Sequence, residues 1–346
     1  MSNTEFPDIS ALELSQKEVN FLKEFEAKTE KFNSELERIA SEIYQHQNQE
    51  KLLERTKKSI HTILSACREF DQFFASRPDL SKHARQEFRE KTNKYFEQSF
   101  FMNRARTWPQ GYPGDYKTLE YTYGNAPLSK GIGLLLDQYF LSTALAVAVR
   151  KRLTTLCDIL RKEIVARPGA KVLNVASGSC RELFDIAPEF NQAGASAICI
   201  DFDKDALQFS SERLSCTGIP AGRIAFRKYN AVKMVNRDRN LKEFGPQDII
   251  YSTGFYDYIA DEILVSLLDA SYDLLRPGGV LIASFKDSRK YETQDYHWLV
   301  KWDAFLQRNE EQTDALFSRS ILSTGTIRKF REQSGVIHFY VVTKSQ

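Results

Sequence analysis

Short apolar runs alternate with helical stretches from Lys171 onward, and this alternation limits the fold more than any other feature of the chain. The runs are KVLNV, AICID, RIAFRKY, DIIYS and VLIASF, with helical patterns after each of the first two and again over residues 260–275. Strands that alternate with helices form a parallel sheet covered on both faces. The tail differs, because TIRKF and VIHFYVV flank REQSG and indicate an antiparallel hairpin. We therefore predict a doubly wound α/β sheet that ends in an antiparallel hairpin.

The part of the chain before residue 100 has the period of helices instead. Apolar residues recur at three- and four-residue spacing within 19–43, 52–74 and 84–100, which predicts a helical bundle. The breaker SRPDLS separates the last two helices and offers Asp79 or Ser81 as a helix cap. Packing is the usual role of such apolar faces. As a unit, a helical cap ahead of a catalytic sheet often closes over the ligand, so the bundle is also a candidate pocket wall.

Residues 107–125, TWPQGYPGDYKTLEYTYGN, combine prolines and glycines with several aromatic side chains. We interpret this segment as an ordered aromatic loop suited to an amphipathic ligand. The alternative is a loop packed as a plug between domains. A helix is expected again over 132–164. The predicted domains are a helical bundle or lid at 1–106, the loop and connecting helices covering the site at 107–165, and the sheet domain at 166–346.

Composition excludes several classes of function. The formal net charge of +2 gives no electrostatic reason to bind nucleic acid or acidic membranes, and 42% hydrophobic residues support a folded, soluble protein. The five cysteines form no CxxC pair and the histidines show no ligand spacing, so we expect a reducing compartment and no metal. No signal peptide or membrane span is predicted. We expect a cytoplasmic monomer or homodimer that binds a small molecule.

The first predicted strand leads into a turn of small residues, and the second ends in a carboxylate. The turn comprises Ala176, Ser177, Gly178, Ser179 and Cys180, and a helix is expected to begin near Arg181. Small residues let a ligand approach the backbone, and the helix offers free amide hydrogens. Asp201 stands where an acidic residue of a nucleotide-binding sheet accepts hydrogen bonds from ribose hydroxyls. Asp203 and Asp205 are expected to cap or solvate the helix over 206–214.

Residues 171–285 resemble the class I S-adenosylmethionine-dependent methyltransferases, which have a Rossmann-like sheet. The resemblance is carried by NVASGSC, CIDFD, YNAV and LLRPGGVLIASF, with a Pro-Gly-Gly turn expected before the fifth strand. It implies that Asp201 holds the ribose of S-adenosylmethionine, that Phe202 lies against the adenine and that Asn230 and Ala231 meet its edge. The residues implied to face the methionine part are Ser252, Thr253 and Gly254. The mouth where an acceptor binds is implied to include Phe255, Tyr256, Asp257 and Tyr258.

The turn after the first strand departs from this family's pattern. Asn174 stands in place of the usual acidic residue, and Ala176 and Cys180 replace two of three glycines, while Gly178 remains. Alanine and cysteine are small, so the resemblance still implies that Asn174, Ala176, Ser177, Gly178 and Cys180 border the cofactor.

A narrower resemblance covers most of the chain from about Arg104. GYPGDY at 111–116, LNVASGSCRE at 173–182 and the WLVKW segment are similar to bacterial proteins assigned to making 3-hydroxypalmitic acid methyl ester. This implies an acceptor that is a small molecule, such as a fatty-acid-like compound or a secondary metabolite.

The chemistry of methyl transfer decides which side chains are catalytic candidates. A carboxylate acceptor needs no base, whereas a hydroxyl or amine would need one, and Asp257, Tyr256 or Tyr112 are candidates. We expect Tyr112 and Tyr116 to cover the ligand, where aromatic rings steady a sulfonium. Two alternatives stay open. The chain could cyclise S-adenosylmethionine itself, as azetidine-2-carboxylate-forming enzymes do, with release of methylthioadenosine; or it could be a non-catalytic nucleotide-binding scaffold.

Overall fold

The computed structural model describes residues 14–43, 48–302 and 304–346, and it divides the chain into two compact units. The helical unit comprises Met1–Gly114, Asn125–Thr143 and Glu292–Asp303. The sheet unit comprises Asp115–Gly124, Ala144–Tyr291 and Ala304–Gln346. The chain therefore passes between the two units several times.

This division differs from the predicted domains in two places. The stretch 107–165, expected to be one segment, contributes residues to both units. Residues 292–303, expected within the sheet domain, belong to the helical unit. The physical reason for the second difference is Trp298, whose side chain is fully buried among aromatic rings of that unit.

The helical unit is built from helices, of which the first three are long, as the period of the apolar residues before residue 100 predicted. They are α1 Gln16–Ile43, α2 Gln49–Phe73, α3 Pro78–Phe96, α4 Phe100–Thr107, α6 Ile132–Ser142 and the π-helix η4 Asp295–Leu299. Asn48 caps α2 by accepting hydrogen bonds from the Glu50 and Lys51 amides. The prediction that Asp79 or Ser81 caps α3 is wrong, because the helix already begins at Pro78, a residue favoured at the first helical position.

Trp298 forms the centre of the aromatic core of the helical unit. Its ring centroid lies 5.1 Å from that of Phe25, 5.3 Å from that of Phe70 and 5.8 Å from that of Phe88. The indole nitrogen donates a hydrogen bond to Asp71 Oδ2 at 3.0 Å, so burial leaves no polar atom of the ring unsatisfied. The apolar faces expected to pack as a core do so.

The sheet unit contains the predicted doubly wound sheet with its terminal hairpin. The strands are β1 Lys171–Val175, β2 Ser196–Asp201, β3 Ile224–Lys228, β4 Gln247–Thr253, β5 Leu275–Lys286, β6 Thr326–Arg331 and β7 Ile337–Thr343. Their order is β3-β2-β1-β4-β5-β7-β6. The first five are parallel, and β7 is antiparallel to both β5 and β6. The carboxyl ends of β1, β2, β4 and β5 therefore share one edge.

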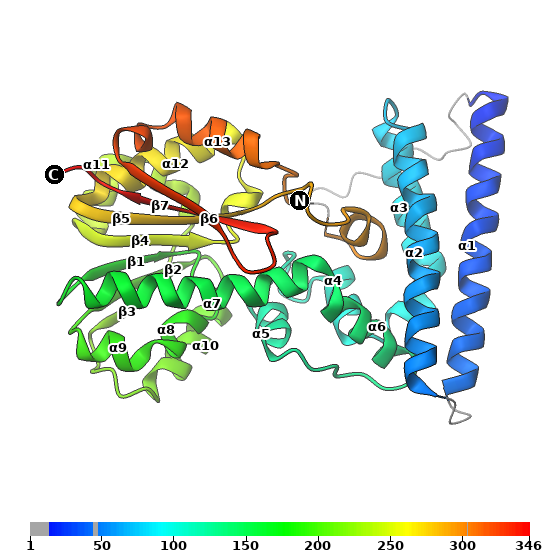
Figure 1. Ribbon diagram of the computed structural model, residues 1–346, viewed down its shortest axis with the longest axis horizontal. Coiled ribbons are helices and arrows are strands. Elements are labelled where there is room, and N and C mark those ends of the chain that lie inside the picture. The colour runs from blue at the N-terminus through cyan, green and yellow to red at the C-terminus, as the bar shows by residue number, and fades with distance from the viewer. Residues whose placement is uncertain (1–13, 44–47, 303) are drawn as a thin grey trace. The chain divides into compact units, whose positions relative to one another are not determined.

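Helices cover both faces of this sheet (Figure 1). One face carries α7 Ala144–Val165, α8 Arg181–Asp185, α9 Ala187–Gln192 and α10 Lys204–Ser215; the other carries α11 Arg237–Phe244, α12 Asp261–Leu274 and α13 Glu310–Arg319. Shorter elements are α5 Tyr116–Gly124, η2 Ala231–Val235, η3 Tyr256–Tyr258 and η5 Ile321–Thr324. Within the described residues no single helix is long and apolar enough to cross a membrane, and α6 and α7 meet that test only as a pair.

Two predicted boundaries of helices and strands were wrong. The helix expected over 132–164 is interrupted at Thr143, whose extended backbone separates α6 from α7. The Pro-Gly-Gly turn expected before the fifth strand lies within the irregular start of β5, where the pairing with β4 shifts register between Gln247 and Ile249.

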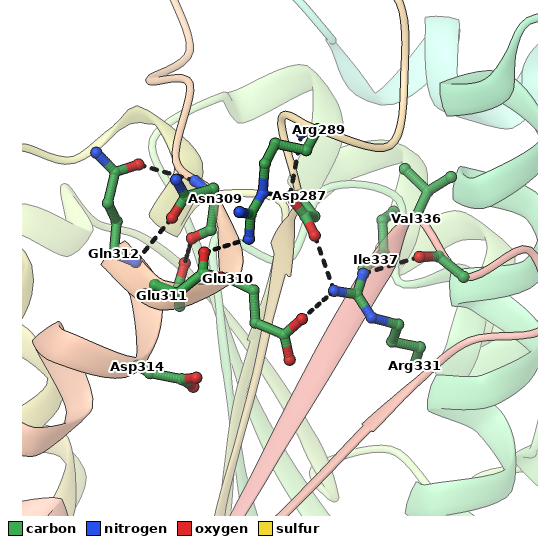
Figure 2. Close-up of polar contacts among 12 residues, drawn as sticks. Asp287, Arg289, Asn309, Glu310, Glu311, Gln312, Asp314, Arg331, Val336 and Ile337 are labelled. Atoms are coloured by element: carbon green, nitrogen blue, oxygen red, sulfur yellow. Dashed lines mark hydrogen bonds and ion pairs between the residues drawn. The ribbon is translucent and has the colours of Figure 1, made fainter.

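A cluster of charged side chains fastens the terminal hairpin to α13 (Figure 2). Arg331 Nη2 lies 2.8 Å from Asp287 Oδ2 and also pairs with Glu310. Lys329 Nζ lies 2.7 Å from Asp314 Oδ2. Arg331 and Lys329 on β6 thus form ion pairs with Asp287, the residue after β5, and with carboxylates on α13. These pairs connect the hairpin to α13.

Asp295 makes the stability of the helical unit depend on pH. Its buried carboxyl accepts a hydrogen bond from the Tyr139 hydroxyl at 2.6 Å. Burial raises the pKa of Asp295 to about 7, although the Tyr139 hydrogen bond opposes the shift. Between about pH 4 and about pH 7 the folded protein retains a proton that the unfolded chain has lost. The free energy of unfolding therefore falls as the pH rises through this window.

Asp295→Asn is expected to flatten this dependence and to raise the free energy of unfolding above pH 7 by at least about 1.4 kcal/mol, the equivalent of one pKa unit. Denaturant unfolding monitored by tryptophan fluorescence is the measurement, because all three tryptophans belong to the helical unit. A variant that loses stability equally above and below this window would contradict the assignment.

Candidate functional site

The turn between β1 and α8 has an unusual backbone. Ala176, Gly178 and Cys180 all lie in the left-handed region, with φ of 55°, 52° and 47°. A side chain in this region costs roughly 1 to 2 kcal/mol, so two non-glycine residues here store conformational energy. Such strained positions concentrate at functional sites. The turn expected from the sequence is therefore present, with Ala176 and Gly178 only half-buried.

Asp201, at the carboxyl end of β2, holds this turn in place. Its Oδ2 accepts a hydrogen bond from the Gly178 amide at 2.8 Å, and its Oδ1 accepts one from the Asp203 amide at 2.9 Å. Ser210 on α10 holds the same residue from its carbonyl, because the Ser210 hydroxyl donates a hydrogen bond to the Gly178 carbonyl oxygen at 2.8 Å. Each carboxylate oxygen can accept more than one hydrogen bond, so Asp201 retains capacity for hydroxyl groups of a ligand.

The electrostatics of Asp201 follow from its burial. The residue is 6% exposed, and desolvation raises the pKa of its carboxyl, while the backbone amides of Asp203 and Gly178 lower it. Nearby, the buried hydroxyl of Ser177 has no hydrogen-bond partner among the residues that the structure describes. A buried polar atom of this kind costs free energy until a ligand or water satisfies it. The turn and Asp201 thus fit a ligand that carries hydroxyl groups.

The residues expected beside an adenine lie next to Asp201. Phe202 is 53% exposed, which is high for a large aromatic side chain. Asn230 is exposed and caps η2 by accepting a hydrogen bond from the Val232 amide, whereas Ala231 is buried in the core. Asp203 caps α10 by accepting hydrogen bonds from the Asp205 and Ala206 amides, as predicted.

Two residues expected to border the cofactor, Asn174 and Cys180, are buried beneath the turn. Asn174 is buried and donates from Nδ2 to Glu182 Oε1 at 2.8 Å, and Cys180 is fully buried with its sulfur 3.8 Å from the same nitrogen. Tyr251 on β4 donates to the same Glu182 oxygen at 2.7 Å. Burial raises the pKa of Glu182. The structure therefore brings a carboxylate from α8 to the position where Asn174 departs from the family pattern.

The carboxyl end of β4 was expected to face a methionine part. Ser252 is buried and donates from Oγ to the Val175 carbonyl at 2.8 Å, which ties β4 to β1. Thr253 and Gly254 are half-buried. Gly254 has φ of 95°, and a Cβ there would lie 2.8 Å from Arg152 Nη1. A Cβ at this position would displace the guanidinium of Arg152, and the positive φ itself favours glycine.

Asp257 and Tyr256, expected as catalytic residues, have other partners. Asp257 Oδ2 lies 2.6 Å from Lys286 Nζ, and its Oδ1 accepts from the Lys286 amide at 3.2 Å. Burial lowers the pKa of Lys286, while Asp257 opposes that shift. Tyr256 is 1% exposed and its ring stacks on that of Phe285 at 5.9 Å. These contacts make Asp257 one half of an ion pair and Tyr256 a packing residue.

The segment expected as an aromatic loop is half helical. Asp115 accepts hydrogen bonds from the Lys117 and Thr118 amides, which starts α5 directly after the glycines. Tyr116 on α5 is 4% exposed, and a Cβ on Gly178 would lie 4.0 Å from its Cβ. Tyr116 therefore adjoins the turn. Tyr112 belongs to the helical unit, so its expected role over the ligand stays a prediction.

An ion pair holds α5 on the sheet unit. Arg213 on α10 donates to both oxygens of Glu120, at 2.6 Å and 2.5 Å. The Tyr116 ring lies 5.3 Å from the ring of Phe209, also on α10. Sequence reasoning missed this arrangement, because Glu120 and Arg213 are far apart in the chain and neither belongs to a motif.

Comparison with solved structures supports the fold. A possible exported protein from Bordetella parapertussis is similar over 93% of this chain and 97% of that chain, with 16% sequence identity and a TM-score of 0.53. This similarity concerns the arrangement of helices and strands over nearly the whole of both chains. Weaker similarities are found to two solved structures of methyltransferases. An O-methyltransferase family protein from Burkholderia thailandensis has 15% identity and a TM-score of 0.45, covering 59% and 60% of the two chains. Magnesium protoporphyrin IX methyltransferase from Synechocystis PCC 6803 has 12% identity and a TM-score of 0.46, covering 65% and 92%.

No protein-family model matches this sequence, and no curated protein matches it either. The likeness to solved structures therefore concerns the arrangement of helices and strands, and the activity has to be argued from the side chains of the site.

Glu182→Ala is expected to lower the free energy of unfolding by at least about 2 kcal/mol, because it leaves buried donors on Asn174 and Tyr251 without an acceptor. Glu182→Gln keeps the Oε1 acceptor and is expected to cost clearly less. Urea unfolding followed by far-ultraviolet circular dichroism measures both variants. Equal losses for the alanine and glutamine variants would contradict the proposed support of the turn.

Proposed function

We propose that this protein is an S-adenosylmethionine-dependent methyltransferase that acts on a small molecule. The observation that carries the proposal is the position of Asp201, whose carboxylate is bonded to the backbone of the Gly178 turn at the carboxyl edge of the sheet. Ligands of doubly wound sheets bind at this edge, and an acidic residue at the end of the second strand accepts hydrogen bonds from ribose hydroxyls. The second support is the sheet itself, whose order β3-β2-β1-β4-β5-β7-β6 ends in an antiparallel hairpin. A sheet of this kind was expected from the resemblance to class I methyltransferases.

The neighbouring residues fit the rest of an adenosyl group. Phe202 offers an exposed ring for stacking against adenine, and Asn230 offers a polar side chain at its edge. The unpartnered Ser177 hydroxyl and the small residues of the turn fit a ligand that approaches the backbone closely.

The acceptor in this proposal is a fatty-acid-like molecule or a secondary metabolite with a carboxylate or hydroxyl group. Its support is the sequence resemblance of residues 111–116 and 173–182 to proteins that make 3-hydroxypalmitic acid methyl ester. A carboxylate is favoured further by the ion pair of Asp257 with Lys286, since a paired carboxylate is a poor general base and a carboxylate acceptor needs none.

The residues of the site would act mainly by positioning. S-adenosylmethionine, when bound, supplies an electrophilic methyl group on a sulfonium. Asp201 and the Gly178 turn would bind and orient the ligand, and Tyr116 would exclude water beside the turn. The hydrogen bonds that fix Asp201, Gly178 and Ser210 preorganise this part of the site before any ligand arrives.

Asp201→Ala is expected to weaken binding of S-adenosylhomocysteine by at least about tenfold, because charge-assisted hydrogen bonds to the ribose are lost. Isothermal titration calorimetry measures the affinity. Asp205→Asn, which alters an exposed carboxylate on the first turn of α10, serves as the control and should bind as the unaltered protein does. If Asp201→Ala and the control bind equally well, the ribose assignment fails.

Mass spectrometry of the products defines the reaction. With S-adenosylmethionine and an extract that contains the acceptor, we expect S-adenosylhomocysteine, and with S-adenosylmethionine alone we expect no turnover. Methylthioadenosine formed without any acceptor would instead identify the cyclising reaction. Failure of the unaltered protein to bind either S-adenosylmethionine or S-adenosylhomocysteine would overturn the proposal altogether.

A further inference from the structure

Arg152 on α7 is a buried cation with no carboxylate partner in the part of the chain that the structure describes. It is 4% exposed, which is rare for arginine. Throughout residues 14–43, 48–302 and 304–346, no Asp or Glu oxygen pairs with its guanidinium, although many other arginines of the chain form such pairs. Burying a charge is unfavourable unless an opposite charge and hydrogen bonds compensate it. The position therefore calls for an explanation.

The guanidinium points at the carboxyl end of β4. Its Nη1 lies where a side chain on residue 254 would collide with it, 2.8 Å from the position of a Cβ, and Gly254 leaves that space open. Burial raises the pKa of the Tyr123 hydroxyl on α5, and Arg152 is close enough to oppose this larger effect. A phenol is neutral at ordinary pH, so it does not balance the charge of Arg152.

The surrounding charges leave this end of the site positive. Lys286, at the end of β5, is a second cation, with a side chain that is 11% exposed, and burial together with the positive charge of Arg152 lowers its pKa. Asp257 neutralises Lys286, since both of its oxygens bond to that residue. Glu182 is engaged by Asn174 and Tyr251, and burial raises the pKa of its carboxyl. The carboxylate of Asp257 is paired with Lys286, so the positive charge of Arg152 is left without a negative partner among these residues.

We propose that Arg152 binds a carboxylate of a ligand at the carboxyl ends of β4 and β5. The planar guanidinium matches a carboxylate with two parallel hydrogen bonds, and such a partner would supply the missing negative charge. The inference rests on the proposed function. Two carboxylates are then available at this edge: the one on the methionine part of S-adenosylmethionine, expected beside Gly254, and the one on an acidic acceptor.

The test compares two ligands that differ only in the carboxylate. S-adenosylhomocysteine carries it, and its decarboxylated analogue, S-adenosyl-3-thiopropylamine, does not. Calorimetry is performed on the unaltered protein, on Arg152→Gln and on Lys151→Gln, a neighbouring charge on the same helix. If Arg152 binds the cofactor's carboxylate, the unaltered protein and Lys151→Gln prefer S-adenosylhomocysteine by at least about tenfold, and Arg152→Gln loses this preference.

A second arm addresses the acceptor. Octanoate is titrated into protein saturated with S-adenosylhomocysteine, as a carboxylate on an apolar chain. If Arg152 binds the acceptor's carboxylate, both nucleosides bind equally to all variants, and octanoate binds to the unaltered protein and to Lys151→Gln but not to Arg152→Gln.

The proposal is overturned if the unaltered protein binds both nucleosides equally well and does not bind octanoate, a result that needs no variant to fold. It is also overturned if Arg152→Gln retains both the preference for S-adenosylhomocysteine and any octanoate binding. A protein that binds neither nucleoside fails the proposed function itself, which separates that outcome from a failure at Arg152.

Discussion

The hydrogen bond from the Gly178 amide to the Asp201 carboxylate is the interaction on which the site depends. It joins the turn after β1 to the end of β2, and it places a largely buried negative charge at the edge of the sheet. The strained backbone at Ala176 and Cys180 persists because its surroundings determine it from several sides: Ser210 holds the Gly178 carbonyl, and Ser177 bonds to the Ile200 carbonyl through its amide. Without that frame, two non-glycine residues would not remain in the left-handed region.

The charges of the sheet unit divide along its carboxyl edge. Asp201 places a carboxylate at the end of β2, and Arg152 places an unbalanced positive charge at the end of β4. Asp257 in η3 and Lys286 at the end of β5 form an ion pair and neutralise each other. A ligand with sugar hydroxyls at one end and a carboxylate at the other would complement both ends. Amino-acid-bearing nucleosides have this arrangement, which is why the two proposals about Asp201 and Arg152 support the same ligand class while resting on different residues.

Local sequence patterns predicted the strands, the hairpin and the Asp201 position, because the period of apolar residues and the residues at strand ends are local properties. They could not predict that residues 292–303 join the helical unit, since Trp298 packs against rings more than two hundred residues earlier in the chain. Nor could they identify Arg152 and Glu182, because a buried ionisable side chain on a helix has the same sequence pattern as a solvated one. The sequence contained a signal for the start of α5, because Asp115 precedes a helical run and caps it. The surrounding glycines and prolines indicated a loop instead, and α5 was not predicted.

A crystal structure of the protein with S-adenosylhomocysteine tests the central claim most directly. The account predicts that the ribose hydroxyls lie about 3 Å from the Asp201 carboxylate, with the adenine beside Phe202. Electron density for the nucleoside at another edge of the sheet, or a ribose that makes no hydrogen bond to Asp201, would contradict it.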